Sequence, residues 1–562
     1  MSRSKKLKVL VHSNHSRLVT GFGKNAKNIL LALHKDPDIE VIEAANGVKF
    51  GADLMTPWES HGTHPSDPNI LQQIQGDQAK ERMAQYGFYT IDRIIEETKP
   101  DIYLGVEDIW AFTDYQKKPW WNKINKVLWT TLDSLPILDQ AIQMEPHCDK
   151  MLVWASFAEE EMKRLGHKKV ETIHGAVDYS NFFPLENRKD IRKRFGIDDD
   201  YIIGFVFKNQ LRKSVPNLLQ GFKTFKEQNP EVKAKLLLHT DWSEVGQGWD
   251  IPRYMREMNI AKEDVLSTYL CHSCDFYFIS HYQGEDKNCP KCKQQKCFKT
   301  KTSSKGVSEE QLNEIYNCMD VYCHPFTSGG QEMPIQEAKL AELITLVTEY
   351  SCGEEMCQPE AHSLPLDWFE YREHGTQFKK ASTDPASIES QLLKVFNMSP
   401  EERAEKGKKA REWTIKNFAV ENVGKKVEEF LDRQEKTDYK FDFKRERNAN
   451  PRALVPIAET DSEWLCNLYK YILDREVDPS YEGHQYWMKQ LDNKVEKKEI
   501  ENYFRKTAVE NLQESEKNKK LPFEELLDKD DEGRRIAFVL PSGAQEIFLS
   551  TAILESLNKI YP

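Results

Sequence analysis

The sequence contains no apolar run long enough to cross a membrane. A spanning helix needs roughly 20 consecutive apolar residues, whereas the apolar stretch nearest the start of the chain is only KVLVHS. A signal peptide also requires a longer apolar segment than this one. We therefore expect a soluble, cytoplasmic protein with no membrane insertion.

An excess of positive charge is also missing. The 79 lysines and arginines are outnumbered by 91 aspartates and glutamates, so the formal net charge is −12 at pH 7. Bulk electrostatics therefore do not recruit nucleic acid or an anionic membrane, although a local basic groove is compatible with this total. A share of 39% hydrophobic and 30% charged residues in a chain of 562 is typical of a globular protein with about three or four domains.

Cysteine is sparse outside one short segment. Five of the 11 cysteines lie between Cys271 and Cys297, and an odd number of cysteines without a secretion signal favours metal binding over disulfides. Two Cys-x-x-Cys pairs, separated by fourteen residues, can place four thiolates around Zn²⁺ in a closed tetrahedral site. We predict a structural zinc ribbon inserted at residues 268–302, with the ligands Cys271, Cys274, Cys289 and Cys292.

Other residues of this insertion leave two questions open. His272 and Cys297 are further donors, so the exchange of one ligand is possible. The insertion is also rich in lysine and aromatic residues. They either contact an extended anionic acceptor or form a solvated face around the folded knuckles, which is the commoner case.

Short apolar runs alternate with amphipathic stretches in two successive ranges, 1–185 and 186–435. This alternation predicts an α/β fold of two facing Rossmann-like, doubly wound lobes with a cleft between them. In the first range we expect strands at Lys8–His12, Glu40–Glu43, Asp101–Val106, Lys126–Thr131, Lys150–Trp154 and Glu171–His174, and helices at Asn25–His34 and Phe88–Glu97. In the second we expect strands at Tyr201–Lys208, Lys233–Thr240, Asp320–Phe326 and Leu343–Tyr350.

The last part of the chain changes character. Residues 436–460 are polar and aperiodic, which predicts a linker. A small all-α module is expected at 461–515, followed by a second, charged linker at 516–533. Residues 534–562 contain one strand pattern, a loop and a helix pattern. Because a lone unit of this kind cannot bury its own faces, we interpret it as the start of a further α/β domain.

In each lobe, one motif follows the first expected strand. Gly21 and Gly23 lie between a strand and a helix, where glycine lets the backbone approach a ligand closely; an ordinary tight turn explains this motif equally well. In the second lobe, Asn209, Arg212 and Lys213 follow the strand end. Cations at this position can neutralise a departing diphosphate without a metal.

A third motif runs from Asp320 to Ala338. The expected strand is followed by a turn at Ser328, Gly329 and Gly330, and a helix begins near Pro334, since proline is favoured in a first helical turn. In this arrangement the N–H groups at the start of the helix are directed at the position of a bound anion. Glu337, one turn into the helix, can accept hydrogen bonds from ribose hydroxyls.

With the segments HGAVD (174–178), NQLRKS (209–214) and GVSEEQL (306–312), these motifs resemble the retaining glycosyltransferases of family 4 over residues 7 to about 432. The resemblance implies a nucleotide-sugar held mainly by the second lobe and an acceptor held mainly by the first. It implies that the diphosphate is held by Arg212 and Lys213, the ribose by Glu337, and the donor phosphates from the opposite lobe by Gly21 and Gly23. The turn at 328–330 would lie beneath the sugar.

The sequence departs from the family pattern at one place. The family usually carries two glutamates eight positions apart, and Gly329 stands eight positions before Glu337. Glu332 is nearby and is a candidate for the missing carboxylate. The usual Gly-Phe-Gly is replaced by Gly330-Gln331-Glu332. This departure bears on sugar recognition more than on diphosphate binding.

The family also implies transfer with retention of configuration, through an oxocarbenium-like transition state and without a catalytic metal. Glu107, Asp108 and Asp133 end strands of the first lobe, so each is a candidate to orient an acceptor hydroxyl. Helix caps and turn acids are an equally good explanation of each. With Arg212, Lys213 and Glu332 they complete the set of catalytic candidates.

Two C-terminal segments carry further resemblances. The pattern from Leu468 to Leu491 resembles a small helical domain of unknown function found in large bacterial and phage proteins, to which we assign attachment. The segment RRIAFVLPSGAQEIFLSTAILESLNKIYP resembles the opening of a heptosyltransferase-type lobe.

We therefore predict an enzyme that transfers a hexosyl or pentosyl group from a nucleotide-sugar to an acceptor hydroxyl. The acceptor is either a saccharide or protein, or a hydroxymethylated pyrimidine in phage DNA, which the zinc ribbon and the phage-like modules suggest. The alternative is a non-catalytic sugar-nucleotide-binding or scaffold protein. The sequence does not identify the sugar, the base, the acceptor or the oligomeric state.

Overall fold

The computed structural model describes residues 6–18, 20–300, 305–441 and 449–516. The chain divides into two compact units between Arg445 and Glu446, within the range interpreted as the first linker. The α/β unit expected at 534–562, and the second linker apart from Glu516, lie outside the described residues. Among the helices that the structure describes, none is long and apolar enough to span a bilayer.

The first lobe contains a seven-stranded parallel sheet in the order β3-β2-β1-β4-β5-β6-β7. Its strands are β1 (Leu7–Asn14), β2 (Ile39–Lys49), β3 (Glu59–His64), β4 (Ile102–Val106), β5 (Lys126–Thr130), β6 (Lys150–Val153) and β7 (Val170–Thr172). The six strands expected from apolar runs are all present. The edge strand β3, with the sequence ESHGTH, has no apolar run and was not predicted.

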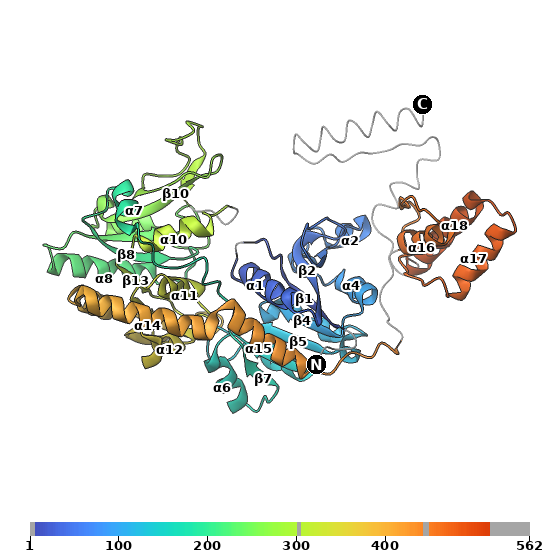
Figure 1. Cartoon of the computed structure of the whole chain (residues 1–562), viewed down its shortest axis with the longest axis horizontal. Helices are drawn as coiled ribbons and strands as arrows, with labels where there is room; N and C mark the ends of the chain where they lie inside the picture. The colour runs from blue at the N-terminus through green and yellow to red at the C-terminus, as the bar shows by residue number, and fades with distance from the viewer. Residues whose placement is uncertain (1–5, 19, 301–304, 442–448, 517–562) are drawn as a thin grey trace. The chain divides into compact units, whose positions relative to one another are not determined.

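Helices lie between these strands (Figure 1). They are α1 (Gly21–Lys35), α2 (Pro68–Ile74), α3 (Gln78–Gln85), α4 (Ile91–Thr98), α5 (Asp139–Met144) and α6 (Ser156–Arg164), with short 3₁₀ turns such as η1 (Ile109–Phe112). In α1, Ile29, Leu30 and Leu33 recur at helical spacing and are buried in one core with Val9 and Val11 of β1. This packing fixes the start of α1 at the carboxyl end of β1.

The second lobe contains a mixed sheet in the order β11-β10-β9-β8-β13-β14-β15, with β12 paired to β10. Its strands are β8 (Tyr201–Val206), β9 (Ala234–His239), β10 (Val265–Cys271), β11 (Tyr277–His281), β12 (Phe298–Thr300), β13 (Val321–His324), β14 (Thr345–Thr348) and β15 (Leu364–Leu366). Only β11 and β12, which belong to the cysteine-rich insertion, pair antiparallel within this sheet. A separate hairpin consists of β16 (Trp368–Arg372) and β17 (Lys379–Thr383).

The helices of this range include one that leaves the second lobe. They are α7 (Arg188–Phe195), α8 (Val215–Gln228), α9 (Ile251–Glu257), α10 (Glu309–Asn317), α11 (Met333–Leu340), α12 (Cys352–Cys357), α13 (Pro385–Phe396), α14 (Pro400–Phe418) and α15 (Val420–Asp432). Helix α15 packs on α1 of the first lobe, where Val423, Val427 and Phe430 share its core (Figure 1). The C-terminal end of the range assigned to the second lobe therefore completes the first.

The second unit is helical, as predicted for 461–515. It contains α16 (Asp461–Asn467), a π-helical turn η7 (Leu468–Ile472), α17 (Glu482–Asp492) and α18 (Lys497–Glu516). Its own small core includes Leu465, Leu468, Ile472, Ile500 and Phe504.

Candidate functional site

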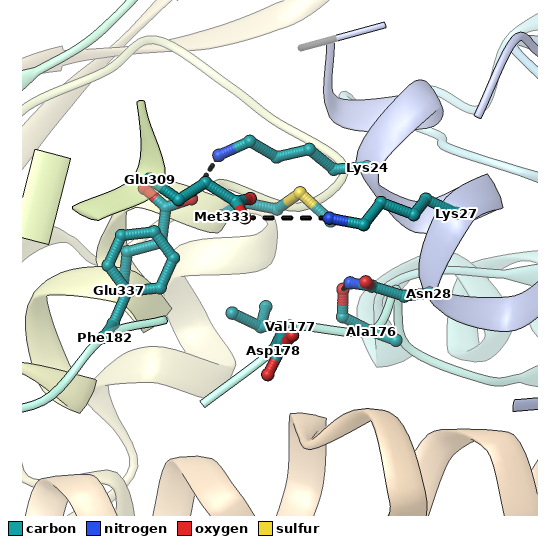
Figure 2. A pocket seen from close by; sticks show the side chains of 10 residues that line it. All are labelled: Lys24, Lys27, Asn28, Ala176, Val177, Asp178, Phe182, Glu309, Met333 and Glu337. Carbon is teal, nitrogen blue, oxygen red and sulfur yellow. Dashed lines mark hydrogen bonds and ion pairs between the residues drawn. The ribbon is translucent and has the colours of Figure 1, made fainter. Parts of the chain in front are cut away.

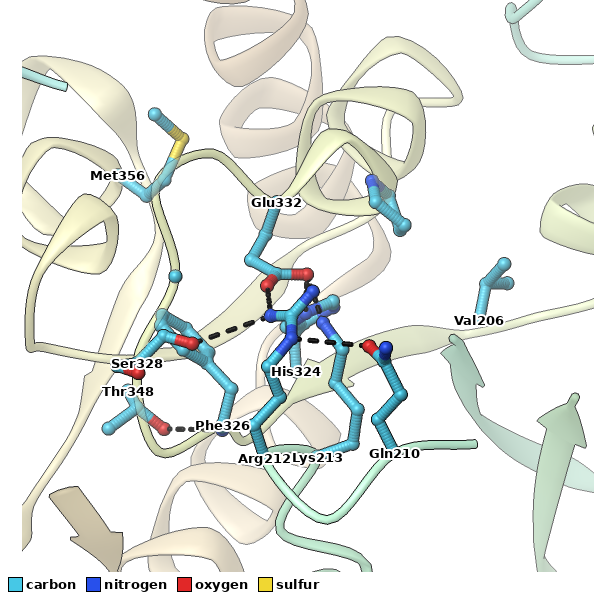
Figure 3. Close-up of polar contacts among 12 residues, drawn as sticks. Val206, Gln210, Arg212, Lys213, His324, Phe326, Ser328, Glu332, Thr348 and Met356 are labelled. Atoms are coloured by element: carbon cyan, nitrogen blue, oxygen red, sulfur yellow. Dashed lines mark hydrogen bonds and ion pairs between the residues drawn. The ribbon is translucent and has the colours of Figure 1, made fainter. Parts of the chain in front are cut away.

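Two cations of the second lobe converge on one carboxylate (Figure 3). Arg212 and Lys213 follow β8 and both pair with Glu332, which directly precedes α11. The ring of His324, at the end of β13, places its Nε2 3.1 Å from a Glu332 oxygen. The two motifs predicted in this lobe at strand ends are thus brought together in one cluster, in which Lys213, His324 and Glu332 are buried.

The charges of this cluster stabilise each other. Burial alone would raise the pKa of the Glu332 carboxyl, but Arg212 and Lys213 hold it well below its ordinary value. Burial, together with the neighbouring Arg212, lowers the pKa of the Lys213 ammonium. Burial lowers the pKa of His324 to about 4, so its ring is neutral at pH 7. The cluster holds two cations against one anion and so keeps a net positive charge.

Glu332 also accounts for the glycine at 329. A Cβ at Gly329 would lie 2.7 Å from Oε1 of Glu332, so the Glu332 carboxylate occupies the space beside this residue. The side chain of Glu332 thus lies beside position 329, where the family resemblance expects a carboxylate, and it is bound to the two cations.

The glycine-rich turn contacts the first lobe. A Cβ at Gly330 would lie 2.5 Å from Cβ of Thr131 and 2.9 Å from a carboxylate oxygen of Asp133. Beside the turn, the ammonium of Lys380 donates to the hydroxyl oxygens of Ser134 and Ser328, each at 2.7 Å. The lobes therefore meet directly at the cation cluster.

Acidic side chains face this contact from the first lobe. Oδ1 of Asp108 accepts a hydrogen bond of 2.8 Å from Thr131, and burial, together with the charge of Asp133, raises the pKa of Asp108 to about 6. Against the opposing effect of burial, the charge of Glu332, and after it the charge of Asp133, raises the pKa of Arg212. Asp108 and Asp133 are thus close enough to interact electrostatically with Arg212, one of the two cations predicted to hold the diphosphate.

Glu107 is placed differently from Asp108. It is buried and accepts a hydrogen bond of 3.2 Å from Asn46, whose own oxygen lies 2.7 Å from the ring of His12. Burial raises the pKa of Glu107 to about 8, so it is mostly protonated at pH 7. This side chain belongs to a polar network beneath the strand ends.

The starts of two helices meet between the lobes. Thr20 caps α1 by accepting a hydrogen bond from the amide of Gly23, and a Cβ at Gly21 would lie 4.0 Å from the sulfur of Met333, the first residue of α11. Gly23 tolerates no side chain, because a Cβ there would lie 2.5 Å from the carbonyl oxygen of Leu18. Two helix N-termini, both favourable for anions, are therefore adjacent.

Beside them a charged pocket opens between α1 and the second lobe (Figure 2). Lys24 donates to Oε1 of Glu337 at 3.0 Å, and the hydroxyl of Tyr316 donates to Oε2 at 2.8 Å. The Lys27 ammonium lies 3.7 Å from Glu309. The remaining lining residues are Asn28, Ala176, Val177, Asp178, Phe182 and Met333. Glu337, predicted to hold ribose, thus faces the first lobe.

The HGAVD segment joins the lobes beside this pocket. Gly175 exchanges two hydrogen bonds with the side chain of Gln331, of 2.7 and 2.9 Å. His174 lies 2.7 Å from Glu355 of α12, and the amide of Ala176 donates to Asn25 of α1. This segment therefore fixes how the two helix starts approach each other.

Asn209 has a supporting position. Its amide donates to the carbonyl oxygens of Asp241 and Trp249, and its oxygen accepts from the amide of Trp249. The indole of Trp249 in turn donates to the carbonyl oxygen of Lys213. Asn209 thus holds the loop that supports the cations.

The four predicted metal ligands form a compact group. The sulfurs of Cys271 and Cys292 lie 3.7 Å apart, and those of Cys274 and Cys289 lie 3.8 Å apart. A tetrahedral site with Zn–S bonds of about 2.3 Å requires sulfurs roughly 3.8 Å apart. Backbone amides also point at the sulfurs of Cys271 and Cys289. These residues fit a closed Zn²⁺ site.

The spare donors are also near this group. The sulfur of Cys297 lies 3.4 Å from that of Cys271, whereas Nε2 of His272 is buried without a hydrogen-bond partner. Cys297 is thus close enough to exchange with a ligand.

Three participants were not predicted from the sequence: Lys24, Tyr316 and Lys380. Lys24 directly follows the glycine loop at 21–23, so its position beside the candidate site could have been predicted from the sequence. Tyr316 and Lys380 reach the site from elements whose sequences carry no ligand signal, and only the fold shows them.

The two-lobed fold is similar to solved structures at low sequence identity. A sucrose-phosphate synthase from Thermosynechococcus elongatus is 11% identical, with a TM-score of 0.53 over 76% of this chain and 98% of that one. HepE from Anabaena, solved with UDP-glucose, is 10% identical, with a TM-score of 0.51 over 76% of this chain and 100% of that one. A glycosyltransferase from Rickettsia africae is 12% identical, with a TM-score of 0.50 over 76% of this chain and 98% of that one.

Residues 457–520 match a family described as a domain of unknown function, DUF4214. No curated protein matches the chain. The comparisons show that the chain has the two-lobed fold of GT-B glycosyltransferases, followed by this helical domain.

Proposed function

We propose that the protein is a glycosyltransferase that moves a sugar from a nucleotide-sugar to an acceptor hydroxyl. One observation carries the proposal: Arg212 and Lys213 converge at the strand ends of the second lobe, beside the turn at 328–330, which contacts Asp133 of the first lobe. In open α/β sheets, this edge is where ligands bind.

The donor would lie along the lobe contact. Arg212 and Lys213 take the diphosphate by displacing the Glu332 carboxylate, and the N-termini of α1 and α11 add favourable dipoles. Glu337 accepts the ribose hydroxyls once Lys24 releases its Oε1 oxygen, and the Lys24 ammonium then turns to the phosphates. Since HepE is solved with UDP-glucose, uridine diphosphate sugars are the first donors to test.

The leaving diphosphate needs charge stabilisation in the transition state. Arg212 and Lys213 supply fixed positive charge at that point, and Lys213 is itself buried. We propose that transfer proceeds with retention and without a catalytic metal, so the zinc ribbon has a structural role.

The acceptor would approach from the first lobe. Asp108 and Asp133 face the leaving diphosphate and can orient an acceptor hydroxyl. Their negative charge favours a neutral hydroxyl over the phosphodiester of DNA. We therefore propose a saccharide or a protein as acceptor, and transfer to hydroxymethylated DNA is an outcome that would overturn this choice.

The test of the donor site is the double variant Arg212→Ala with Lys213→Ala. We expect it to lose UDP binding and donor hydrolysis by at least about 100-fold, as each charge-assisted contact contributes about 1.5–3 kcal/mol. Lys208→Ala is the control, because Lys208 lies on the same loop but is half exposed and pairs with Glu244. If the double variant stays folded and turns over donor at the normal rate, the site is wrong.

A second function is favoured by one observation. Glu332 already pairs with both donor-binding cations, as in a protein that binds sugar nucleotides without turning them over. Tight binding of UDP-glucose with no hydrolysis, and no transfer to any saccharide or protein acceptor, would support this non-catalytic function.

A further inference from the structure

The first Cys-x-x-Cys pair, Cys271–Cys274, forms a knuckle that contacts α10, a helix that reaches the proposed donor site. Asp275 follows the ligand Cys274, and its carbonyl oxygen accepts a 2.8 Å hydrogen bond from the side-chain amide of Gln311 in α10. The amide of Asp275 donates to the carbonyl oxygen of Cys271. The chain that wraps the metal is therefore bonded directly to α10.

A second contact lies one turn further along α10. The hydroxyl of Tyr277, the first residue of β11, donates to Glu314, which also pairs with Arg194 at 2.6 Å. Both contacts come from residues within three positions of Cys274. They place the orientation of α10 under the control of the first knuckle.

The side chain of Gln311 makes two hydrogen bonds that matter here. Its side-chain oxygen accepts from the amide of Ser308 at 3.0 Å, which completes the capping box of α10, while its amide nitrogen holds Asp275. The start of α10 and the knuckle are thus fixed by the same side chain.

The other end of α10 contacts Glu337 of α11 and the connection between the lobes. The hydroxyl of Tyr316 donates to Oε2 of Glu337. Asn313 and Asn317 bind the backbone of Phe183 and Leu185, in the segment that crosses from the first lobe to the second. A shift of α10 would therefore move both the proposed ribose carboxylate and the lobe connection.

We infer that metal binding by the four thiolates sets the affinity of the protein for its donor nucleotide, through α10. This inference rests on the proposed function, in which Glu337 holds the donor. Gln311, Tyr277 and Tyr316 are positioning residues in it: they touch neither donor nor acceptor. Without the metal, the thiolates of Cys271, Cys274, Cys289 and Cys292 are no longer held together, so we expect the contacts of Asp275 and Tyr277 with α10 to loosen and Glu337 to lose its fixed geometry.

The first experiment measures UDP binding by calorimetry with the full chain, loaded with zinc and after removal of zinc by a chelator. Coupling between sites is typically about 5- to 150-fold, so we expect the dissociation constant for UDP to rise at least about fivefold on metal removal. Linkage requires the reverse effect: saturating UDP must tighten zinc binding by the same factor, measured by competition with a chromophoric chelator.

The second experiment separates coupling from loss of folding. The double variant Gln311→Glu with Tyr277→Phe keeps all four thiolates, and glutamate at 311 preserves the capping box while removing the amide that binds Asp275. We expect this variant to bind zinc and to melt as a folded protein, yet to bind UDP more weakly. Removal of its zinc should then cause little further loss.

The outcomes distinguish this inference from the proposed function. UDP affinity that is the same in the zinc-loaded and zinc-free protein, or in the double variant and the wild type, overturns the coupling and leaves the donor site intact. If the zinc-loaded wild type binds neither UDP nor UDP-glucose, the donor site itself is wrong.

Discussion

Glu332 is the central residue of the proposed donor site, because its single carboxylate pairs with both cations that a diphosphate would need. Side chains reach it from two elements: Arg212 and Lys213 from the loop after β8, and His324 from the end of β13. A phosphate that enters this site must replace the carboxylate.

Replacing Glu332 by glutamine tests this competition. We expect the free energy of unfolding to fall by about 3 kcal/mol, since removing one partner of a buried ion pair leaves an uncompensated charge. UDP should bind about tenfold more tightly, because each charge-assisted hydrogen bond is worth about 1.5–3 kcal/mol and no carboxylate competes. Melting curves with and without UDP check both effects. Weaker UDP binding would show that Glu332 itself contacts the donor.

Glu107 predicts a pH dependence of stability. Its pKa is raised by burial to about 8 in the folded chain, against 4.5 when exposed. The folded state thus holds the proton more tightly, and this stabilising contribution is complete below about pH 4.5 and is lost as pH rises through 8. One pKa unit corresponds to about 1.4 kcal/mol, so the loss amounts to several kcal/mol.

Glu107→Gln removes this titration and keeps the acceptor for Asn46. Relative to wild type, the melting temperature of the variant should therefore increase from pH 5 to pH 8.5. Asp139→Asn, a substitution in the exposed first turn of α5, is the control and should show no such trend. Parallel curves for Glu107→Gln and wild type would mean that Glu107 is ionised in the folded protein.

At this scale the sequence predicted which residues gather, but not how they pair. Strand ends of a parallel sheet meet at one edge, which brings Arg212, Lys213 and the turn at 328–330 together. The ion pair between Lys24 and Glu337 spans 313 positions, and no local pattern specifies such a partner. Periodicity indicates the buried face of an element, not the side chain opposite.

At the scale of elements, the N-caps of α10 and α14 form a matched pair for comparison. Ser308 of α10 and Ser399 of α14 both form capping boxes. Ser308→Ala and Ser399→Ala should each cost about 1 kcal/mol of stability, visible as similar falls in melting temperature. Only Ser308→Ala should weaken UDP binding, because α10 carries Tyr316. Equal UDP affinities in the two variants would separate α10 from the donor site.

The elements most readily predicted from the sequence were buried strands, because a strand covered on both faces has a continuous apolar run. Strand β3 was missed because it is an edge strand with a polar sequence. The antiparallel strands β11 and β12 were missed as well, since the cysteine spacing predicts a metal site but not that its strands extend the second sheet. The destination of α15 could not be predicted, because its apolar stripe fits either lobe.

At the scale of the whole molecule, the two compact units predict a clean truncation. A protein ending at Phe441 keeps every helix and strand described for the first unit. We expect it to stay monodisperse in size-exclusion chromatography and to bind UDP as the full chain does. Loss of UDP binding would show that the helical domain contributes to the site.

Ending the chain at Phe418 should have the opposite effect. This truncation removes α15 and uncovers the apolar face of α1, which Val423, Val427, Phe430 and Leu431 bury. Burying one such side chain contributes about 1.5–3 kcal/mol, so the loss of four exceeds the stability of many domains. We expect aggregation, measured by light scattering.

The return of α15 to α1 also sets the order of events on the ribosome. Residues 7–185 emerge first, yet one face of their core stays uncovered until residue 431 has been synthesised. At roughly 5–20 residues per second, that interval lasts on the order of tens of seconds. The first lobe must therefore wait for the second to be translated, and nascent chains stalled between these points are natural clients for chaperones.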